Sequence, residues 1–179
     1  MISGKKIQCQ YWQSGVLLFL VLVLAGCSEQ RPEAREAPDF NLLSLTSDQQ
    51  ISLQNYRGDV VYLTFWASWC IPCRKEMPYL TQLWQRHRAQ GFRVIGISVD
   101  EDVAAARQFA EEYDLPYPLA RDADRSISSL YRVPGYPTHY LVDRRGRIRF
   151  SGLGFDDSDI TAVGQEVETL LQESVDGAD

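Results

Sequence analysis

Hydrophobic and polar positions follow two different periods along this chain, and together they predict strands that alternate with helices. Residues 60–66 and 94–99 are continuous apolar runs rich in β-branched and aromatic side chains. Such runs are typical of strands buried on both faces. Apolar residues recur at helical spacing after each run, over 77–87 and over 103–113, which predicts two amphipathic helices. Pro78 lies inside the first helix, where we expect it to cause a bend.

Shorter elements complete the pattern. Asp100 is a plausible N-cap for the helix over 103–113. The other predicted elements are a hairpin over 40–53 with its turn at 46–49, a strand over 117–120, a helix over 126–131, a hairpin of 139–142 with 148–151, and a last helix over 160–171 that begins at the acidic cluster 156–159. This order predicts one α/β domain, with a central mixed sheet and helices on both faces.

The start of the chain has the layout of an export signal. Lys5 and Lys6 precede an apolar run over 16–25, which is too short to span a bilayer comfortably. The run ends in Leu24-Ala25-Gly26-Cys27, which resembles the lipobox of bacterial lipoproteins and implies cleavage before Cys27 and lipidation of that residue. An uncleaved N-terminal anchor is the alternative. Either way, the sequence predicts a chain that is exported and held at a membrane.

Cleavage would divide the chain into a signal peptide (1–26), a tether (27–38) and a domain (39–174). The tether is polar and charged, as is typical of a flexible linker. Removing residues 1–26 from the 179 leaves 153, enough for one compact domain. The signal carries two of the 18 basic residues and none of the 24 acidic ones, so the net charge changes from −6 to −8. This balance argues against a nucleic-acid partner, which would need a basic surface.

Two of the four cysteines remain free to pair in the mature chain. Cys9 leaves with the signal and Cys27 is consumed by lipid, while Cys70 and Cys73 stand where a buried strand gives way to a helix. Unpaired N–H groups and the helix dipole at such a position stabilise a thiolate, so the pKa of a thiol there falls below its usual value of about 8.5. The pair therefore predicts a redox dithiol.

Two separated motifs resemble the thioredoxin superfamily, and within it the exported thiol–disulfide oxidoreductases of the TlpA/ResA type. They read Phe65-Trp66-Ala67-Ser68-Trp69-Cys70-Ile71-Pro72-Cys73-Arg74-Lys75-Glu76-Met77-Pro78 and Val133-Pro134-Gly135-Tyr136-Pro137-Thr138, with Asp39-Phe40, Leu141-Val142-Asp143 and Gly146 in support. The resemblance covers residues 38–172. It implies a thioredoxin-like fold with an N-terminal β-hairpin extension and an inserted helix–strand unit.

The resemblance also implies roles for single residues. Cys70 would be the exposed nucleophile that forms a mixed disulfide with the substrate, and Cys73 the shielded thiol that resolves it. Pro137 would be cis and packed against the disulfide, leaving the backbone of Tyr136 free for an extended substrate segment. The residues expected to contact the substrate are Trp69, Tyr136 and Thr138.

Glu76 is the candidate proton acceptor. It follows Cys73 by three residues and so shares its helix face. Cytoplasmic thioredoxins carry a buried aspartate at the position of Thr64, whose hydroxyl cannot exchange a proton near neutrality. We expect a partly buried Glu76 to take over and to help deprotonate Cys73. A solvated surface acid is the alternative interpretation.

The leading hypothesis is an enzyme that reduces disulfides in exported proteins such as apocytochromes c, recharged by a membrane electron carrier of the DsbD or CcdA type. The cytochrome-maturation branch often has an acid where Thr138 stands, which counts against that client. We expect a monomer with no metal and no cofactor beyond the Cys70–Cys73 disulfide.

Other functions stay open. A thiol oxidase of the same fold would differ only in reduction potential, which Ile71-Pro72 does not decide. Two thiolates also suit Cu(I), with His139 as a third ligand in a metallochaperone. Zinc would need further ligands, and neither His87 nor His139 stands at zinc-finger spacing. A peroxidase of the peroxiredoxin type would need a threonine at Ala67.

Location follows from the predicted lipid. Ser28 does not resemble an inner-membrane retention signal, so we expect an outer-membrane lipoprotein facing the periplasm in a Gram-negative cell. In a Gram-positive cell the domain would lie outside the plasma membrane. An outer-membrane position would separate the domain from an inner-membrane electron carrier, so this location and the reducing direction oppose each other.

Overall fold

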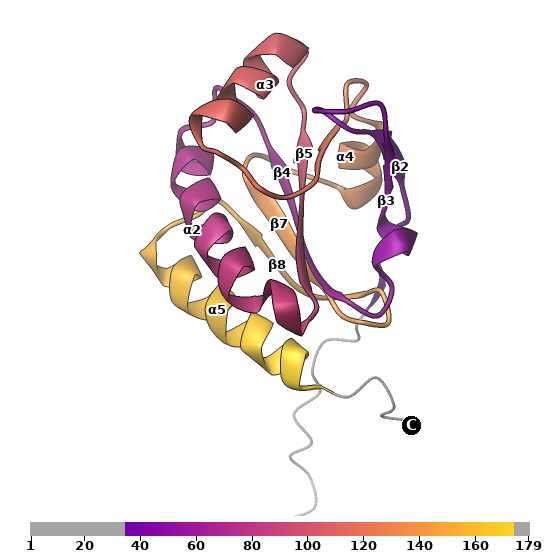
Figure 1. Ribbon diagram of the computed structural model, residues 1–179, viewed down its shortest axis with the longest axis vertical. Helices are drawn as coiled ribbons and strands as arrows, with labels where there is room; N and C mark the ends of the chain where they lie inside the picture. Colours follow the sequence, from indigo (N-terminus) through magenta and orange to yellow (C-terminus); the bar gives the residue numbers. More distant parts are fainter. Residues whose placement is uncertain (1–34, 174–179) are drawn as a thin grey trace, which may run out of the picture. The chain divides into compact units, whose positions relative to one another are not determined.

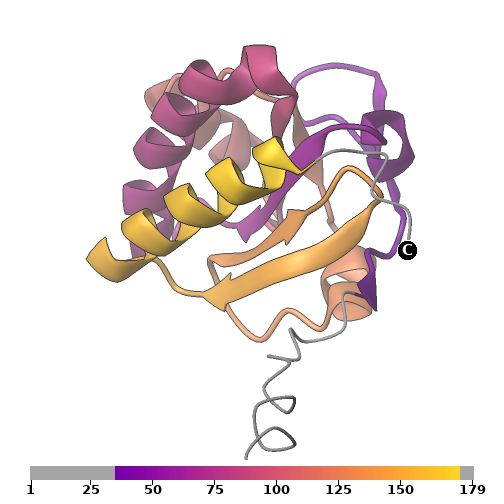
Figure 2. The same cartoon turned by 90° about the horizontal axis from the view of Figure 1, so that it is seen from below.

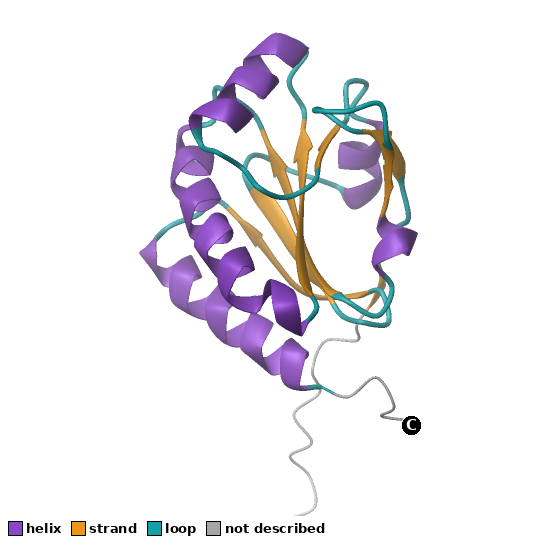
Figure 3. Cartoon of the chain, in the orientation of Figure 1, coloured by secondary structure: helices purple, strands orange, loops and turns teal. Residues whose placement is uncertain are grey.

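The computed structural model describes residues 35–173. Most of the chain predicted as signal peptide and tether, including Cys27, lies outside the described residues, so those assignments stay predictions. The elements in chain order are β1 (Arg35–Glu36), β2 (Asn41–Leu43), β3 (Gln50–Ser52), the 3₁₀ turn η1 (Leu53–Tyr56), β4 (Val60–Trp66), α2 (Ile71–His87), η2 (Arg88–Gln90), β5 (Phe92–Ser98), α3 (Val103–Glu112), β6 (Leu119–Arg121), α4 (Ser126–Tyr131), β7 (Thr138–Val142), β8 (Arg147–Leu153) and α5 (Asp157–Gln172). Figure 3 shows how helices and strands are distributed.

A mixed sheet runs through the centre of the domain, as the sequence predicts. Its strand order is β1-β8-β7-β4-β5-β6, and β2 pairs with β3 in a separate hairpin. The central strand β4 is parallel to β5 and antiparallel to β7. All seven residues of β4 are buried, because β4 lies between two other strands and side chains pack against both faces of the sheet.

Two hydrophobic cores lie on the two faces of this sheet. Tyr62 and Trp66 of β4 belong to the core that α2, α3 and α5 complete. Leu63 and Phe65 alternate with them and face the second core, which includes residues of α4 and of the β2–β3 hairpin. Figures 1 and 2 show α2 and α5 on one face, and α4 on the other with the hairpin. The prediction of helices on both faces is confirmed.

The N-terminal boundary of the fold differs from the predicted one. β1 pairs antiparallel with β8, with Arg35 opposite Ile148, and the Ala37 N–H donates to the Gly146 carbonyl. Residues 35–38, predicted as the end of the tether, therefore belong to the fold. β8 would otherwise leave its outer edge unpaired, and such an edge accepts any adjacent extended segment. A hydrophobic pattern cannot reveal a two-residue strand held by backbone bonds.

Helix caps agree with the sequence at α5 and differ at α3. The N-cap of α5 is Asp156, and Asp159 completes a capping box within the predicted acidic cluster. The N-cap of α3 is Asp102, whose side chain accepts from Ala104 N–H, whereas Asp100 is buried elsewhere. Asp102 is the N-cap because it directly precedes the first helical turn. Among residues 35–173, no helix is long and apolar enough to span a bilayer.

Candidate active site

Cys70 and Cys73 form a disulfide at the start of α2, with sulfurs 2.07 Å apart. Cys70 is the N-cap residue of the helix, and its Sγ accepts the Cys73 N–H at 3.2 Å. Cys73 is fully buried, and Cys70 is only 4% exposed. Cys73 is shielded as expected, but Cys70, expected to be exposed, is also buried in the disulfide, since its sulfur turns toward Cys73 and the helix N-terminus. This end of α2 offers N–H groups and a positive dipole to a thiolate.

A buried carboxylate holds the loop that leads to Cys70. Asp100 follows β5 and is 3% exposed. Its oxygens accept the backbone N–H of Ser68 at 3.0 Å, the Ser68 hydroxyl at 2.7 Å and the Ser98 hydroxyl at 2.9 Å. The Arg74 guanidinium donates to the Ser68 carbonyl at 3.1 Å from the first turn of α2. The approach to Cys70 is therefore fixed from β5 and from α2.

Glu76 is fully buried one turn below Cys73, deeper than the partial burial expected from sequence. It lies against the sheet, where Tyr62 Oη donates to Oε1 at 2.9 Å and Thr64 Oγ1 donates to Oε2 at 2.9 Å. Burial raises the pKa of Glu76 to about 7, and the two hydrogen bonds hold back part of that rise. A carboxyl with this pKa can take up or release a proton near neutrality. The alternative of a solvated surface acid is wrong.

His139 lies on the same side of the sheet as Glu76, which settles a question that the sequence leaves open. It stands opposite Thr64 in the β4–β7 register, so both point to one face. Its Nδ1 lies 3.7 Å from Glu76 Oε1. Burial lowers the pKa of His139 to about 4, so the imidazole is neutral at pH 7.

The second motif forms the loop before β7. The Tyr136–Pro137 peptide bond is cis, as the resemblance implies, and Pro137 is buried. Trp69 is 62% exposed, and its ring meets that of Tyr136 edge-on, with centroids 5.7 Å apart. Thr138 differs from expectation: it is 4% exposed, and its hydroxyl donates to the Gly135 carbonyl at 2.7 Å. Its side chain therefore holds the loop and is almost entirely covered in the disulfide state.

The described residues do not form the copper site considered as an alternative. No group of three or more His, Cys, Asp or Glu side chains within 35–173 could hold a metal ion. His139 faces Glu76 instead. The other histidine, His87, is 6% exposed and packs edge-on against Phe92.

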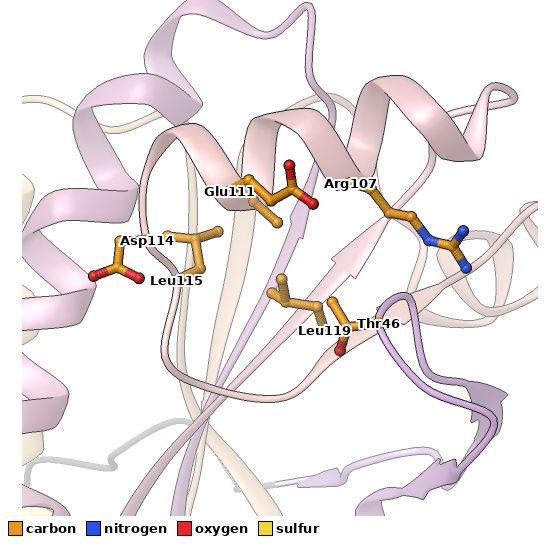
Figure 4. A pocket seen from close by; sticks show the side chains of 7 residues that line it. Thr46, Arg107, Glu111, Asp114, Leu115 and Leu119 are labelled. Carbon is orange, nitrogen blue, oxygen red and sulfur yellow. The ribbon is translucent and has the colours of Figure 1, made fainter.

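A cavity of about 490 Å³ lies apart from the predicted site. Figure 4 shows Arg107 and Glu111 of α3 above Leu119 of β6, and the Arg107 Nε donates to the Leu45 carbonyl at 2.7 Å. None of the residues predicted for thiol chemistry lines this cavity, so we assign it no part in the exchange reaction.

The AhpC/TSA family matches residues 34–151, which is more than half of the chain. The chain belongs to the AhpC/TSA family. This family member is similar to the thiol-disulfide oxidoreductase ResA of Bacillus cereus (strain ATCC 10987 / NRS 248), at 36% identity over 143 residues, 73% of this chain and 82% of the relative. It is 31% identical to ResA of Bacillus subtilis (strain 168) over 153 residues, 80% and 84% of the two chains.

Solved structures of the same kind support the fold of this AhpC/TSA family member. A putative thiol:disulfide interchange protein DsbE from Chlorobium tepidum superposes with a TM-score of 0.75 at 34% identity, covering 78% of this chain and 98% of that one. A putative protein disulfide isomerase from Bacteroides thetaiotaomicron gives 0.71 at 33% identity, covering 78% and 89%. The fold is thioredoxin-like, and the protein is a thiol–disulfide oxidoreductase, as its two motifs predict.

Sequence reasoning missed the partners of Glu76 and the role of Asp100. Tyr62 and Thr64 are two residues apart in β4, so their side chains point to the same face of the sheet. This shared face could have been predicted from the strand alone, and with it the two candidate partners of Glu76. The contact of Asp100 with Ser68 joins segments 32 residues apart. A local pattern carries no signal for such a pair.

Proposed function

We propose that this protein reduces disulfide bonds in exported proteins, with Cys70 as the attacking sulfur, Cys73 as the resolving sulfur and Glu76 as the acceptor of the Cys73 proton. The observation that carries the proposal is the buried Glu76 carboxyl, whose pKa of about 7 suits proton exchange one turn below a buried cysteine. The disulfide itself is the redox group, and the proposal calls on no other cofactor. We propose that the domain acts as a monomer without a nucleic-acid partner.

The first step starts from the reduced dithiol. The Cys70 thiolate, stabilised at the N-terminus of α2, attacks one sulfur of the substrate disulfide. A bond forms between Cys70 Sγ and that sulfur, the substrate S–S bond breaks, and the other substrate sulfur leaves as a thiolate that takes a proton from water. The product is a mixed disulfide between the two proteins.

The second step returns the protein to the disulfide state. The Cys73 thiol gives its proton to the Glu76 carboxylate, and the Cys73 thiolate attacks Cys70 Sγ. The Cys70–Cys73 bond forms, the bond to the substrate breaks, and the substrate leaves as a second thiolate. Two electrons pass from the dithiol to the substrate. A membrane dithiol carrier of the DsbD or CcdA type would then reduce the disulfide by the same exchange.

The surface beside Cys70 suits an extended protein segment. Trp69 and Ile71 flank Cys70 and are 62% and 78% exposed, while Tyr136 offers backbone groups next to the buried Pro137. Apolar side chains with adjacent backbone groups fit a segment that lies across the cis-proline loop. We include apocytochromes c among the proposed clients, as unfolded exported chains whose cysteines must be reduced.

The reduction potential tests the direction of exchange. We expect the Cys70–Cys73 couple to equilibrate near the value of thioredoxin, about −270 mV, when titrated against glutathione or dithiothreitol. A potential near that of DsbA, about −120 mV, would contradict the proposal and make the protein an oxidase.

We also propose that the protein is a lipoprotein with a cleaved signal peptide, held by Cys27 at a membrane, with the outer membrane favoured in a Gram-negative cell. The lipobox-like Leu24-Ala25-Gly26-Cys27 supports this location. Multiple acyl chains on one cysteine would hold the domain firmly. A Cys27→Ser variant should leave the membrane fraction and keep its precursor mass. If the variant fractionates with membranes as the parent protein does, the lipid anchor is wrong.

A further inference from the structure

His139 is an unusual residue to find at the centre of this fold. Its side chain is fully buried, and neither ring nitrogen has a hydrogen-bond partner in the described part of the chain. A buried polar group without a partner has lost its hydrogen bonds to water and gained none in return, which lowers stability. Phenylalanine or leucine would fill the same space without this cost, so packing alone does not account for an imidazole here.

Aromatic rings and a glycine surround the His139 imidazole, and among the described residues only its Nδ1 faces a polar group. The imidazole stacks on Tyr62, with centroids 5.3 Å apart, and on Phe150, at 5.9 Å. Gly152 stands opposite His139 in the β7–β8 register. A Cβ at position 152 would lie 2.4 Å from Nε2, so glycine makes the room that the ring needs. Nδ1 faces the Glu76 carboxyl.

The environment of the two nitrogens selects a tautomer. A proton on Nε2 would leave a buried N–H pointing at Gly152 without an acceptor, which is rarer and costlier than an unpaired lone pair. A proton on Nδ1 faces Glu76 Oε1 at 3.7 Å between heavy atoms. A shift of less than 1 Å would bring this pair to the usual N–H···O distance of about 2.9 Å.

We propose that His139 is a positioning residue that donates its Nδ1–H to the ionised Glu76 carboxylate and thereby keeps Glu76 able to accept the proton of Cys73. The bond is charge-assisted and forms as Glu76 ionises. It joins the bonds from Tyr62 and Thr64, so three donors serve the carboxylate. This inference rests on the proposed function, because it assigns His139 to the same proton transfer.

Neighbouring charged and titratable groups raise or lower the pKa values of Glu76 and His139. Tyr62 lowers the pKa of Glu76 through its hydrogen bond, and Asp159 of α5 raises the pKa of both Glu76 and His139. Burial raises the pKa of Tyr117, and the charge of Glu76 raises it further. β8 places uncharged Phe150 and Gly152 against the ring. Tyr62 and Thr64 of β4 contact the Glu76 carboxyl directly, whereas Tyr117 before β6 and Asp159 of α5 interact with the pair only through charge.

The experiment measures the pKa of the Glu76 carboxyl by ¹³C NMR in variants of His139. Removal of the donor by His139→Phe should raise that pKa by about one unit. His139→Asn places an amide N–H where Nδ1 stood and should restore most of the native value. His139→Gln places it where Nε2 stood and should behave like the phenylalanine variant. His87→Phe is the matched control at the other buried histidine and should change nothing.

A second readout follows the chemistry. The pH midpoint for release of a substrate from the Cys70 mixed disulfide should rise with the Glu76 pKa. For a rise of one pKa unit, release at a pH below the midpoint should be about tenfold slower. An unchanged or lowered Glu76 pKa in the phenylalanine variant overturns the proposal, and so does equal behaviour of the asparagine and glutamine variants. In the unmodified protein, ¹⁵N NMR should find the His139 proton on Nδ1, and a proton on Nε2 overturns the proposal even if no variant folds.

The inference and the proposed function can fail separately. If Glu76→Gln releases substrate at the native rate, the proposed proton transfer is wrong, whatever the His139 variants do to the Glu76 pKa. If Glu76→Gln slows release while the His139 variants leave the Glu76 pKa unchanged, the proposed function stands and the role of His139 is wrong.

Discussion

The Glu76 carboxyl is balanced between burial, which favours its neutral form, and hydrogen bonds from Tyr62 and Thr64, which favour its charged form. Thr64 stands where cytoplasmic thioredoxins carry their buried aspartate, and it serves here as a donor to an acid that comes from the helix instead. A single buried acid with a raised pKa also links the stability of the fold to pH.

The raised pKa of Glu76 predicts how stability depends on pH. The folded pKa, about 7, lies above the model value of 4.5, so the folded protein binds the extra proton between these values. Its contribution to stability is complete below about pH 4.5 and is lost as pH rises through 7. For this group alone, the free energy of unfolding should fall by on the order of 3 kcal/mol between pH 4.5 and pH 8.

Urea unfolding of the oxidised protein at pH 5 and pH 8 measures this effect. Glu76→Gln cannot ionise, so it should gain stability relative to the parent protein on going from pH 5 to pH 8. Glu101→Gln, at a side chain that is 88% exposed, is the control and should follow the parent. Parallel pH dependence in the parent and in Glu76→Gln would contradict the raised pKa.

At the scale of elements, the loop before α2 matters as much as the helix. Residues 67–69 carry Cys70 to its N-cap position, and Asp100 ties them to the end of β5 through Ser68. The loop is therefore held by the end of β5 as well as by α2. Asp102, two residues further on, serves only α3 as its N-cap.

This division predicts different outcomes for two neighbouring acids. Asp100→Ala leaves the buried Ser98 hydroxyl and the part-buried donors of Ser68 without their acceptor, and it should lower the free energy of unfolding by about 3 kcal/mol. It should also speed reduction of the disulfide by dithiothreitol, because the loosened loop opens access to Cys70. Asp102→Ala removes a helix cap and should cost about 1 kcal/mol without a change in the reduction rate. Equal reduction rates in the two variants would show that Asp100 does not control access.

The sequence predicts elements whose hydrophobic period is strong and local. Strand β4 and helix α4 begin and end at the predicted residues because each has a clear period and clear flanking signals. β1 was missed since its stability comes from backbone pairing with β8. The side of the sheet that His139 faces depends on the register between β4 and β7, which no local pattern fixes.

The residues of the candidate site that belong to a sequence motif could be predicted. The contacts between residues far apart in the sequence could not. Cys70, Cys73 and cis-Pro137 follow from the two motifs. The burial of the Thr138 side chain was not predictable, because the motif does not show that the hydroxyl bonds to the Gly135 carbonyl. The partners of Glu76 come from β4 and β7, and their approach is a property of the folded sheet.

At the scale of the whole molecule, the described domain buries the reactive pair and exposes apolar side chains beside it. Both sulfurs and Glu76 are buried, while Trp69 and Ile71 beside them are among the few large apolar side chains that are at least half exposed. Such exposed apolar residues next to a reactive pair indicate a surface for another protein.

Trapping of mixed disulfides tests the central claim most directly. A Cys73→Ser variant keeps the attacking sulfur and lacks the resolving one, so it should accumulate exported proteins bound through Cys70 when expressed in cells. Cys70→Ser and the double variant lack the attacking sulfur and should accumulate none. A Cys73→Ser protein that captures no more partners than the double variant would contradict attack by Cys70, and with it the account of exchange given above.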